Sequence, residues 1–413
     1  MFRHQRNPLR KILTIASILS LVLMALGACG SSAAGNTSPI KIGVSLSLTG
    51  DFSADGLAFQ QGYQLWADHV NANGGILGRK VTLDIVDDAS SDTQTTTNYQ
   101  KLITQDKVDL TFGPFSTLLT KPASVVAARY GYALVEGAGG GPTVFNRGLN
   151  NVFDVSLPVA NNLVSFTQLM NSLPAGQKPA TAAYATEDDP FTQPQVDLAN
   201  QLLTHDGITA AAQEIVYPAE TTDFTPIAQK LILAHADIVV LGTLLPDVTA
   251  FIQAFKQQHY NPKAIIATAG PDQGATFLQG IGGPNDAEAI MVPNGWFAEA
   301  NNPGNAQMVQ AYVAKYGGTF DGISADVPEA YSVGEVVQQA VTENGSLDQA
   351  KLIQKLHSGT FTSVQGTVKF DSTGQNTAAL SYLFQWQGGN LVPIYPAGTL
   401  GAKQPEYPKP NWP

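Results

Sequence analysis

The stretch IKIGVSLSLTGDFSADGLAFQQGYQLWADHV, residues 40–70, passes from one hydrophobic periodicity to another. Residues 40–48 alternate apolar with small or polar side chains, which predicts a β-strand. Residues 49–51 (TGD) break that alternation. Apolar residues then recur at spacings of three and four, which predicts one face of a helix: Phe59, Tyr63, Trp66 and Val70. The stretch therefore predicts a strand followed by a helix, the repeating unit of α/β folds.

The same unit repeats along two runs of the chain. In the first run we expect strands at 81–86, 108–112 and 132–135, with helices at 93–106 and 122–130. In the second run we expect helices at 161–173, 193–205, 224–234 and 247–259, with strands at 180–185, 215–217, 237–242 and 264–267. Repeated βα units imply parallel sheets with helices on both faces. The predicted fold class is therefore α/β, with two Rossmann-like lobes.

The last hundred or so residues follow a different pattern. Helices are expected at 305–316, 328–343 and 347–357, followed by strands at 366–370 and 381–386. Gly388, Gly389 and Asn390 then predict a tight turn into a strand at 391–395, which makes a hairpin. The Pro-rich tail, residues 401–413, is expected to be extended and not helical.

Cys29 is the only cysteine of the 413 residues and directly follows an apolar run at 12–26. Four basic residues precede that run, as in a secretory signal: Arg3, Arg6, Arg10 and Lys11. Residues 26–29 (LGAC) resemble the lipobox of bacterial lipoproteins. We expect residues 1–28 to be removed and a diacylglycerol to hold Cys29 at the outer face of the cell membrane. Residues 29–39 would form a lipidated, flexible spacer. The alternative is a stray cysteine behind an ordinary signal or a transmembrane anchor.

The charge after processing excludes several classes of partner. All 33 acidic residues follow Cys29 and 4 of the 22 basic residues precede it, which leaves 18 basic residues and a formal net charge of −15. Nucleic acid phosphates and anionic lipid repel such a body. We therefore expect no nucleic-acid partner and no membrane contact beyond the lipid anchor. We also expect a monomer. No second apolar run approaches the roughly 18 residues that a membrane span needs.

The usual catalytic and cofactor motifs are missing from the sequence. Its six histidines are scattered singly, and it has no His-Glu-x-x-His, Walker A or Gly-x-Ser-x-Gly pattern. Residues 137–142 (GAGGGP) nearly fit Gly-x-Gly-x-x-Gly, but they end in Pro142 and follow the fourth strand instead of the first. We therefore expect no catalytic residue, no metal and no cofactor.

Two loops after neighbouring strands are candidates for binding. Residues 113–117 place Ser116 and Thr117 at a helix N-terminus, where the dipole favours a carboxylate; the alternative is plain helix capping. Residues 137–141 have backbone amides that can approach a ligand closely, and the alternative is a flexible surface loop. The candidate amides are those of Ala138, Gly139 and Gly140. Together the loops predict an anion cradle at the carboxyl ends of the strands.

The second run contributes two further candidates. Asp272 follows the strand at 264–267, and its carboxylate is a candidate partner for a ligand ammonium group. The alternative for Asp272 is turn initiation. In the loop EDDPF, residues 187–191, the acids are expected to be solvated, while Phe191 supplies an apolar wall.

These residues resemble the type I periplasmic binding proteins, in the leucine/isoleucine/valine-binding branch of ABC-transporter receptors. The resemblance covers residues 40 to about 396 and is carried by IKIGVSLSLTGDFSADG, NANGGILGRKVTLDIVDD, DLTFGPFSTLLTKPAS, DDPFTQ, DIVVLGT and GTVKFDSTGQN. It implies two lobes joined by three crossings, near Leu157, Pro293 and Val364. It also implies that the lobes close around a ligand by a hinge motion. The implied lobes are 40–157 plus 294–364 and 158–293 plus 365–400, followed by the tail 401–413.

The resemblance also implies roles for the candidate residues. Thr117, with Ser116 beside it, matches the position that takes a substrate carboxylate, and Ala138 and Gly140 match the groups that complete that site. Phe191 matches an aromatic wall and Asp272 the partner of the ammonium group. Three positions depart from the family's pattern: Gly140 replaces a hydroxyl residue, Leu244 a tyrosine and Asp55 an aromatic residue. These departures leave another amino acid, an amide or a different small carboxylate open as the ligand.

The expected function is that of a receptor which captures an amino acid or similar small solute and delivers it to an ABC permease. An alternative is a sensor, in which the same module reports its ligand to a signalling partner. A surface hydrolase is a third alternative, in which Ser116 would be the nucleophile.

Overall fold

The first sheet has five parallel strands in the order β2-β1-β3-β4-β5. β1 pairs with β2 along its whole length, from Ile40↔Val81 to Leu46↔Asp87. The strands are β1 (Ile40–Leu46), β2 (Val81–Asp87), β3 (Leu110–Phe112), β4 (Leu134–Glu136) and β5 (Val152–Asp154). The strand predicted at the start of residues 40–70 is therefore confirmed.

The computed structural model describes Met1 and residues 37–413. The predicted signal, Cys29 and most of the spacer lie outside the described residues. Pro39–Pro413 forms one compact unit by itself. Within residues 37–413, no helix combines the length and the apolar character that a membrane crossing requires.

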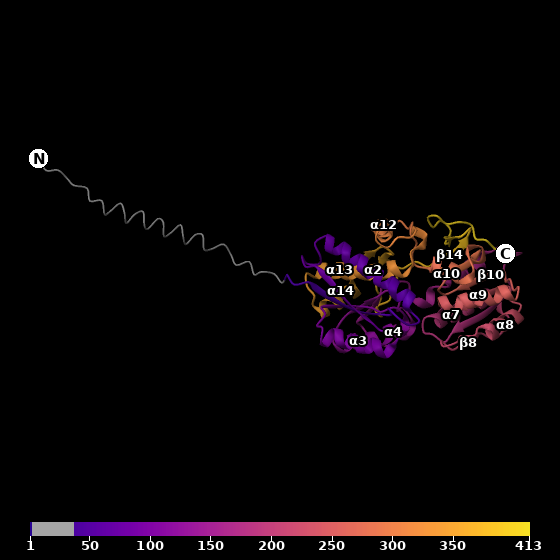
Figure 1. Cartoon of the computed structure of the whole chain (residues 1–413), viewed down its shortest axis with the longest axis horizontal. Helices are drawn as coiled ribbons and strands as arrows, with labels where there is room; N and C mark the ends of the chain where they lie inside the picture. The colour runs from indigo at the N-terminus through magenta and orange to yellow at the C-terminus, as the bar shows by residue number, and fades with distance from the viewer. Residues whose placement is uncertain (2–36) are drawn as a thin grey trace. The chain divides into compact units, whose positions relative to one another are not determined.

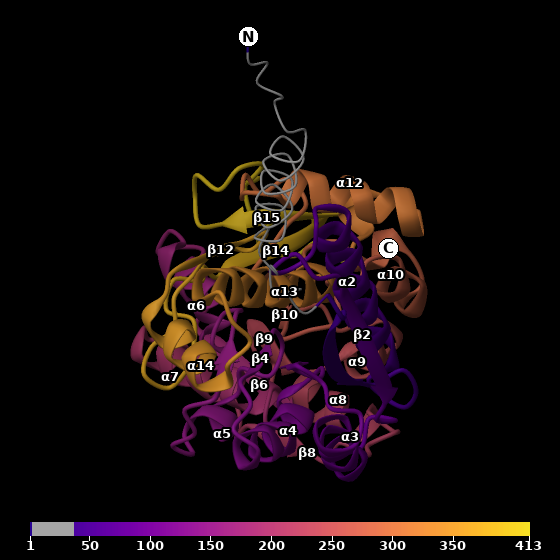
Figure 2. The same ribbon diagram turned by 90° about the vertical axis from the view of Figure 1, so that its left-hand side faces the viewer.

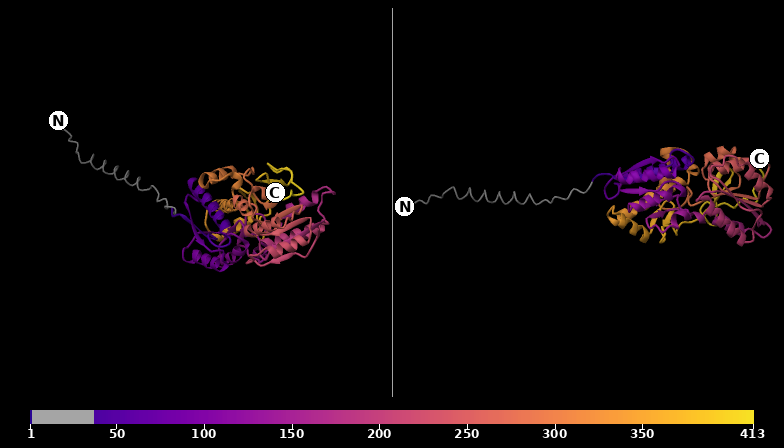
Figure 3. Two further views of the ribbon diagram at one scale, coloured as in Figure 1. Left: turned by 45° about the vertical axis from the view of Figure 1, so that its right-hand side comes forward. Right: turned by 90° about the horizontal axis from the view of Figure 1, so that it is seen from below.

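Helices cover both faces of the first sheet (Figure 2). Ile42 and Val44 of β1 pack in one core with Trp66 of α2 and Val333 of α13. A separate core on the other face joins α3 and α4 to β4 and β5. The helices of this lobe are α2 (Ser53–Ala72), α3 (Asp92–Thr104), α4 (Thr117–Arg129), α5 (Pro142–Phe145), α12 (Asn305–Tyr316), η2 (Phe320–Gly322), α13 (Asp326–Asn344) and α14 (Gln349–Ser358). Segments from both ends of the described chain, indigo to purple and orange to gold, share this lobe (Figure 3).

The second sheet has the order β15-β14-β11-β10-β9-β6-β7, and β8 also pairs with β6. Its strands are parallel except for β14, which pairs antiparallel with both β11 and β15. The strands are β6 (Thr181–Glu187), β7 (Thr209–Ala210), β8 (Ile215–Tyr217), β9 (Ile238–Gly242), β10 (Ala264–Ala267), β11 (Ile290–Asn294), β14 (Tyr382–Gln387) and β15 (Asn390–Tyr395). The hairpin predicted at 388–390 is confirmed, with Gly388 and Gly389 both at positive φ.

Helices also cover both faces of the second sheet. One core joins α6 and α7 to the sheet, and a second joins α8, α9 and α10 to the opposite face. The helices are η1 (Val159–Asn161), α6 (Val164–Ser172), α7 (Thr192–His205), α8 (Thr225–Leu233), α9 (Leu245–Gln257), α10 (Ala275–Ile281) and α11 (Pro284–Ala287). In Figure 1, α2, α3, α4, α13 and α14 gather at one end of the body and α7, α8 and α9 at the other. The predicted α/β fold of two lobes with parallel sheets is confirmed.

The third crossing between the lobes differs from the expected one. β12 (Phe361–Ser363) and β13 (Gly366–Val368) form a small antiparallel hairpin, and Val364 lies in its turn. Val364 and Phe370 are both buried in the core of the first lobe. Asn376 still contacts this lobe, because its Nδ2 donates to the carbonyl of Val155 at 2.7 Å. The chain therefore reaches the second sheet only at β14, later than the boundary predicted at 364/365.

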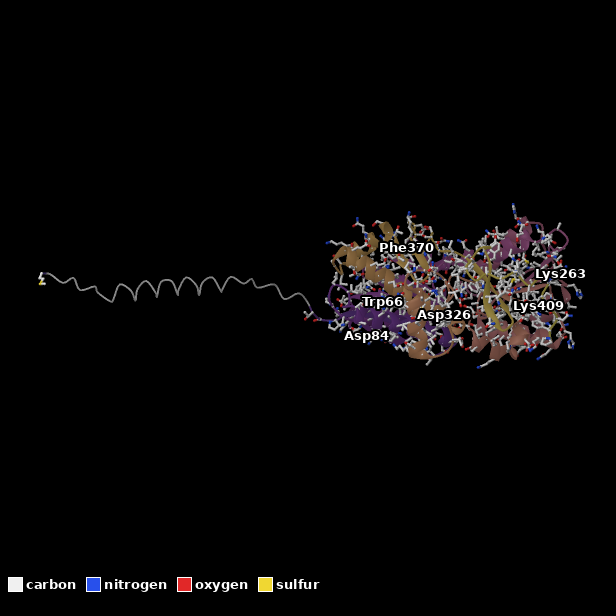
Figure 4. All side chains as sticks on the ribbon, turned by 90° about the horizontal axis from the view of Figure 1, so that it is seen from above. Trp66, Asp84, Lys263, Asp326, Phe370 and Lys409 are labelled. Atoms are coloured by element: carbon white, nitrogen blue, oxygen red, sulfur yellow. The ribbon has the colours of Figure 1, made fainter. Side chains whose placement is uncertain are left out.

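The Pro-rich tail, residues 401–413, contains no helix, as predicted, and it forms no strand. It packs along the second lobe: the backbone N–H of Glu406 donates to Gln385 Oε1 at 2.8 Å. Lys409 lies beside Lys263 (Figure 4), and its backbone N–H donates to the Lys263 carbonyl at 2.7 Å. Its Nζ lies 3.4 Å from the centre of the Trp412 ring. The tail is thus part of the second lobe's surface.

The packing of α13 on α2 requires a glycine and gives a first prediction. A Cβ added to Gly334 would lie 2.1 Å from Trp66 Cδ2, inside the core that the two helices share. We expect Gly334→Ala to lower the free energy of unfolding by about 1–3 kcal/mol through overpacking. Thermal or urea denaturation of the purified protein measures this loss. Gly176→Ala is the matched control, because a Cβ there would meet no atom within 4 Å. Equal stability of the two variants would contradict the described packing.

Candidate functional site

A cavity of about 90 Å³ lies where the loops of the two sheets face each other. The first sheet contributes the segments after β1, β3 and β4 and the end of β5. The second sheet contributes the segments after β6, β9 and β10. Ser156, Asn294 and Gln365, which lie near the expected crossings, line it as well. Carboxyl ends of parallel strands are where open α/β sheets bind their ligands, so this cavity is the candidate binding site.

The structure brings most of the predicted site residues together here. Five of the seven line the cavity: Ser116, Ala138, Gly140, Phe191 and Asp272. Thr117 and Gly139 are not among the lining residues. Two positions noted above as departures from the family's pattern, Asp55 and Leu244, also line the cavity.

The hydroxyl groups after β3 have structural partners or lie behind the cavity. Ser116 has a φ of 75°, and its Oγ accepts a hydrogen bond from the backbone N–H of Leu119 at 3.3 Å. Ser116 therefore caps α4, the alternative considered from the sequence. Thr117 is fully buried, and its Oγ1 has no hydrogen-bond partner among the described residues. Gly141 lies between this oxygen and the second lobe. A Cβ on Gly141 would lie 2.7 Å from both Thr117 Oγ1 and the carbonyl oxygen of Pro190, so the space there fits only a glycine.

Two carboxyl groups meet behind the loop after β4. The parallel register pairs Glu136 with Asp154, which places both side chains on one face of the sheet. Glu136 is fully buried and accepts a hydrogen bond from the backbone N–H of Gly139, which explains why Gly139 turns away from the cavity. Burial, and then the charge of Asp154, raises the pKa of Glu136 well above its ordinary value.

Asp154 lines the cavity and keeps one oxygen without a partner. Its Oδ1 accepts from the backbone N–H of Ser156 at 2.8 Å. Its Oδ2 is buried and has no hydrogen-bond partner among residues 37–413. A Cβ on Gly140 would lie 2.1 Å from this Oδ2. Gly140 therefore makes room for the carboxyl group, and burial raises the pKa of Asp154 to about 7.

A second carboxyl pair is bridged by a side chain of the second lobe. Gln273 donates through Nε2 to Asp55 Oδ1 and, at 3.1 Å, to Asp326 Oδ2. Ser324 Oγ also donates to Asp326, at 2.8 Å. Burial, followed by the charges of Asp326 and Asp272, raises the pKa of Asp55 well above its ordinary value. The amide of Gln273 thus links the two lobes across the cavity.

Asp272 lines the cavity and also stabilises the turn in which it lies. Its Oδ1 accepts from the backbone N–H of Gly270 at 2.8 Å, within the turn closed by the bond from the Gln273 N–H to the Gly270 carbonyl. The residue also lines the cavity, so the turn does not remove it from the site. Burial, and then the charge of Asp326, raises the pKa of Asp272 to about 7.

Glu329 stands among these carboxyl groups. It lies on α13 three residues after Asp326, one helical turn away and facing the same side. Burial raises the pKa of Glu329 well above its ordinary value, and four charges add to the effect. They come from Asp326, Asp154, Asp272 and Glu136. None of the residues that line the cavity, all within residues 37–413, is a lysine, arginine or histidine.

Sequence reasoning missed Asp154, Asp326 and Glu329. Asp154 ends β5, a strand of three residues that was not predicted. The spacing of Asp326 and Glu329 was visible in the sequence, but acids in the first turn of a helix are also expected from the helix dipole alone. The apolar walls come from Phe52, Phe115, Phe191, Leu244 and Leu245.

The buried acids make the stability of the ligand-free protein depend on pH. Because the pKa of Asp154 is raised to about 7, its contribution to stability is present below pH 4 or so and is lost as the pH rises through 7. Asparagine cannot ionise, so the free energy of unfolding of Asp154→Asn should exceed that of the wild type by up to about 4 kcal/mol at pH 8. The gain should be smaller at pH 5. Calorimetry of the ligand-free proteins at both pH values measures the difference.

Asp371 provides a control with the opposite shift. Burial alone would raise the pKa of Asp371, but hydrogen bonds from Thr373, Gln375 and Gly374 hold this pKa below its ordinary value. The contribution of Asp371 to the stability of the protein is therefore complete above pH 4 or so. Asp371→Asn should cost the same at pH 5 and pH 8. If Asp154→Asn followed that flat profile, the raised pKa of Asp154 would be wrong.

Comparisons with known proteins agree on the family. Residues 39–390 match the family described as "Periplasmic binding protein". The Leu/Ile/Val-binding protein homolog 7 of Brucella abortus (strain 2308) is 26% identical over 389 residues, which cover 91% of this chain and 96% of that protein. The Leu/Ile/Val-binding protein homolog 8 of Brucella melitensis is 27% identical over 379 residues, which cover 88% of this chain and 92% of that protein.

Solved structures show the same fold at lower identity. LivJ of Streptococcus pneumoniae, a branched-chain amino acid transporter substrate-binding protein in complex with isoleucine, has a TM-score of 0.74 at 20% identity, covering 86% of this chain and 97% of that one. A solute-binding protein of an ABC transporter from R. palustris, in complex with benzoate, has a TM-score of 0.74 at 17% identity, covering 89% and 98%. The relatives are binding proteins, which confirms the expectation that the chain is not an enzyme. The chain belongs to the periplasmic binding protein family, in the type I branch that includes the Leu/Ile/Val-binding proteins.

Proposed function

We propose that this protein is the extracytoplasmic, lipid-anchored substrate-binding component of an ABC importer. It captures an amino acid or a related small solute between its lobes and delivers it to the permease. The family and the bound solutes of two structural neighbours, isoleucine and benzoate, support this class of ligand.

The observation that carries the proposal is a small cavity whose walls come from both lobes. The lobes are joined only by crossings near Leu157, near Pro293 and before β14, so they can rotate about these segments. Gln273 holds the second lobe to Asp55 and Asp326 of the first. A solute enters when these contacts open and is enclosed when they form again.

The predicted site residues have defined parts in this proposal. The backbone amides after β3 and β4, including those of Ala138 and Gly140, receive a carboxylate or another acceptor of the solute. Phe191 forms an apolar wall and Asp272 receives an ammonium group. Ser116 holds the loop after β3 through its cap on Leu119. Thr117 and Gly139 lie behind the cavity, where Thr117 packs beside Gly141 and the backbone N–H of Gly139 donates to Glu136.

A ligand panel tests the proposed function. Residues 30–413, screened by thermal shift against amino acids, amides and small acids, should be stabilised by at least one of them, because a ligand that binds only the folded state raises its stability. Asp272→Ala should weaken the binding of an ammonium-bearing hit by about 2–4 kcal/mol, measured by calorimetric titration. Asp188→Ala, an exposed acid of the neighbouring loop, is the control and should bind normally. A panel without any hit would contradict the proposal.

The anchor is separable from the binding site. Cys29→Ala removes the only thiol of the chain. It should therefore release the protein from the membrane fraction or leave it unprocessed. Ligand affinity should stay unchanged, because the cavity is built entirely from residues after position 50. Fractionation with an immunoblot and a titration of the released protein measure both effects. A Cys29→Ala protein that stayed processed and membrane-bound would refute the lipid anchor.

A further inference from the structure

The ionisable side chains that line the cavity are all acidic. Six carboxyl groups line it: Asp55, Asp154, Asp189, Asp272, Asp326 and Glu329. The carboxylate of Asp189 already has partners just before α7, because its Oδ1 accepts from the backbone N–H groups of Phe191 at 2.8 Å and Thr192 at 3.0 Å. Of the other five, Asp154, Asp272 and Asp326 lie close enough to Glu329 that, besides burial, their charges raise its pKa. Asp55 shares an amide with Asp326, and no basic side chain lines the cavity with these acids. A cavity that takes up a neutral amino acid needs one acid for the ammonium group, not five.

Side chains and backbone groups of the protein donate hydrogen bonds to only some of these carboxyl oxygens. Asp55 and Asp326 share the amide of Gln273. Asp154 is 1% exposed, lines the cavity and leaves Oδ2 without a partner among the described residues. Glu329 lines the cavity as well, and the charges of Asp326 and Asp154 act on it. An oxygen that is buried without a donor costs free energy, and an N–H group of a ligand can supply the missing donor.

The kind of cation is limited by geometry. Within the described part of the chain, no three acidic, histidine or cysteine side chains converge closely enough to hold a metal ion. The unpartnered Oδ2 of Asp154 needs a hydrogen-bond donor, which a protonated amine supplies and a quaternary ammonium group lacks. Asp154 and Glu329 belong to the first lobe and Asp272 to the second, so the acids face the cavity from both sides.

We propose that the solute is a small organic cation with two N–H-bearing positive groups, such as a diamine or a basic amino acid. One group meets Asp272 and the other meets Asp154 and Glu329. This inference rests on the proposed function and specifies its ligand. The apolar walls, including Phe115 and Leu244, lie against the methylene chain between the two charges.

The binding of such a cation is coupled to protons. Asp154 faces Glu136 of β4 and Glu329 of α13, while Asp272 faces Asp326 of α13 and Asp55 of α2. The mutual repulsion of these groups adds to burial in favouring the protonated acids. A bound cation favours their charged forms, so it releases protons on binding and its affinity rises between pH 5.5 and pH 8.

Matched probes test the inference on the membrane-extracted protein. We expect 1,5-diaminopentane to bind at least 10-fold more tightly than pentylamine, or L-lysine at least 10-fold more tightly than L-norleucine. In each pair only the second positive group differs. Calorimetric titration in two buffers of different ionisation enthalpy should also show proton release. Calcium chloride serves as the metal probe and should give no heat of binding.

Two variants locate the effect. Glu329→Gln should reduce the preference for the doubly charged probe at least 10-fold. Glu335→Gln, on the same helix, should retain it, because Glu335 accepts from the backbone N–H of Val364 at 2.8 Å and does not line the cavity. Circular dichroism verifies the fold of both variants. If Glu329→Gln does not fold, the comparison of matched probes on the wild type decides alone.

The outcomes separate this inference from the proposed function. Tight binding of leucine, benzoate or another neutral or anionic probe, with no preference for the second charge, overturns the cationic ligand and leaves the solute receptor intact. Calcium binding with an affinity equal to that of the diamine also overturns it. Absence of binding by every probe counts against both proposals.

Discussion

All strands of the first sheet run in one direction, and the loops after β1, β3 and β4 therefore leave the sheet at a single edge. The loops after β6, β9 and β10 do the same in the second sheet. The crossings hold these two edges opposite each other. Residues as distant in sequence as Asp55 and Gln273 thus come into hydrogen-bond contact. A change that disturbed the parallel pairing would move the residues of the site apart, even if every side chain were kept.

The fold was largely predictable because its strands are buried and its helices are amphipathic. In β1, the alternation of Ile40, Ile42, Val44 and Leu46 marks the face that packs on α2 and α13. The short strands were harder to predict. β5 and β12 have three residues each, too few to establish a period. The third crossing was misplaced for the same reason, since a hairpin of three-residue strands keeps the chain in the first lobe beyond Val364.

The site was only partly predictable. The loops after β3 and β4 and the acid after β10 were identified because their position in a parallel sheet is known from the pattern of elements. Whether a polar side chain faces the cavity or the backbone depends on local geometry that no spacing reveals. Ser116 caps a helix, Thr117 lies behind the cavity and Gly139 binds Glu136. Asp154 became visible only when β5 was paired with β4, because the register places it beside Glu136.

Gly140 makes room for the carboxyl group of Asp154, so the two positions share one space. A single methyl group at position 140 would lie 2.1 Å from Asp154 Oδ2, which means that a larger residue there requires the carboxyl group to shift. The effect of a substitution at position 140 on stability should therefore depend on which residue stands at position 154. The effects of residues that share a space in this way do not add.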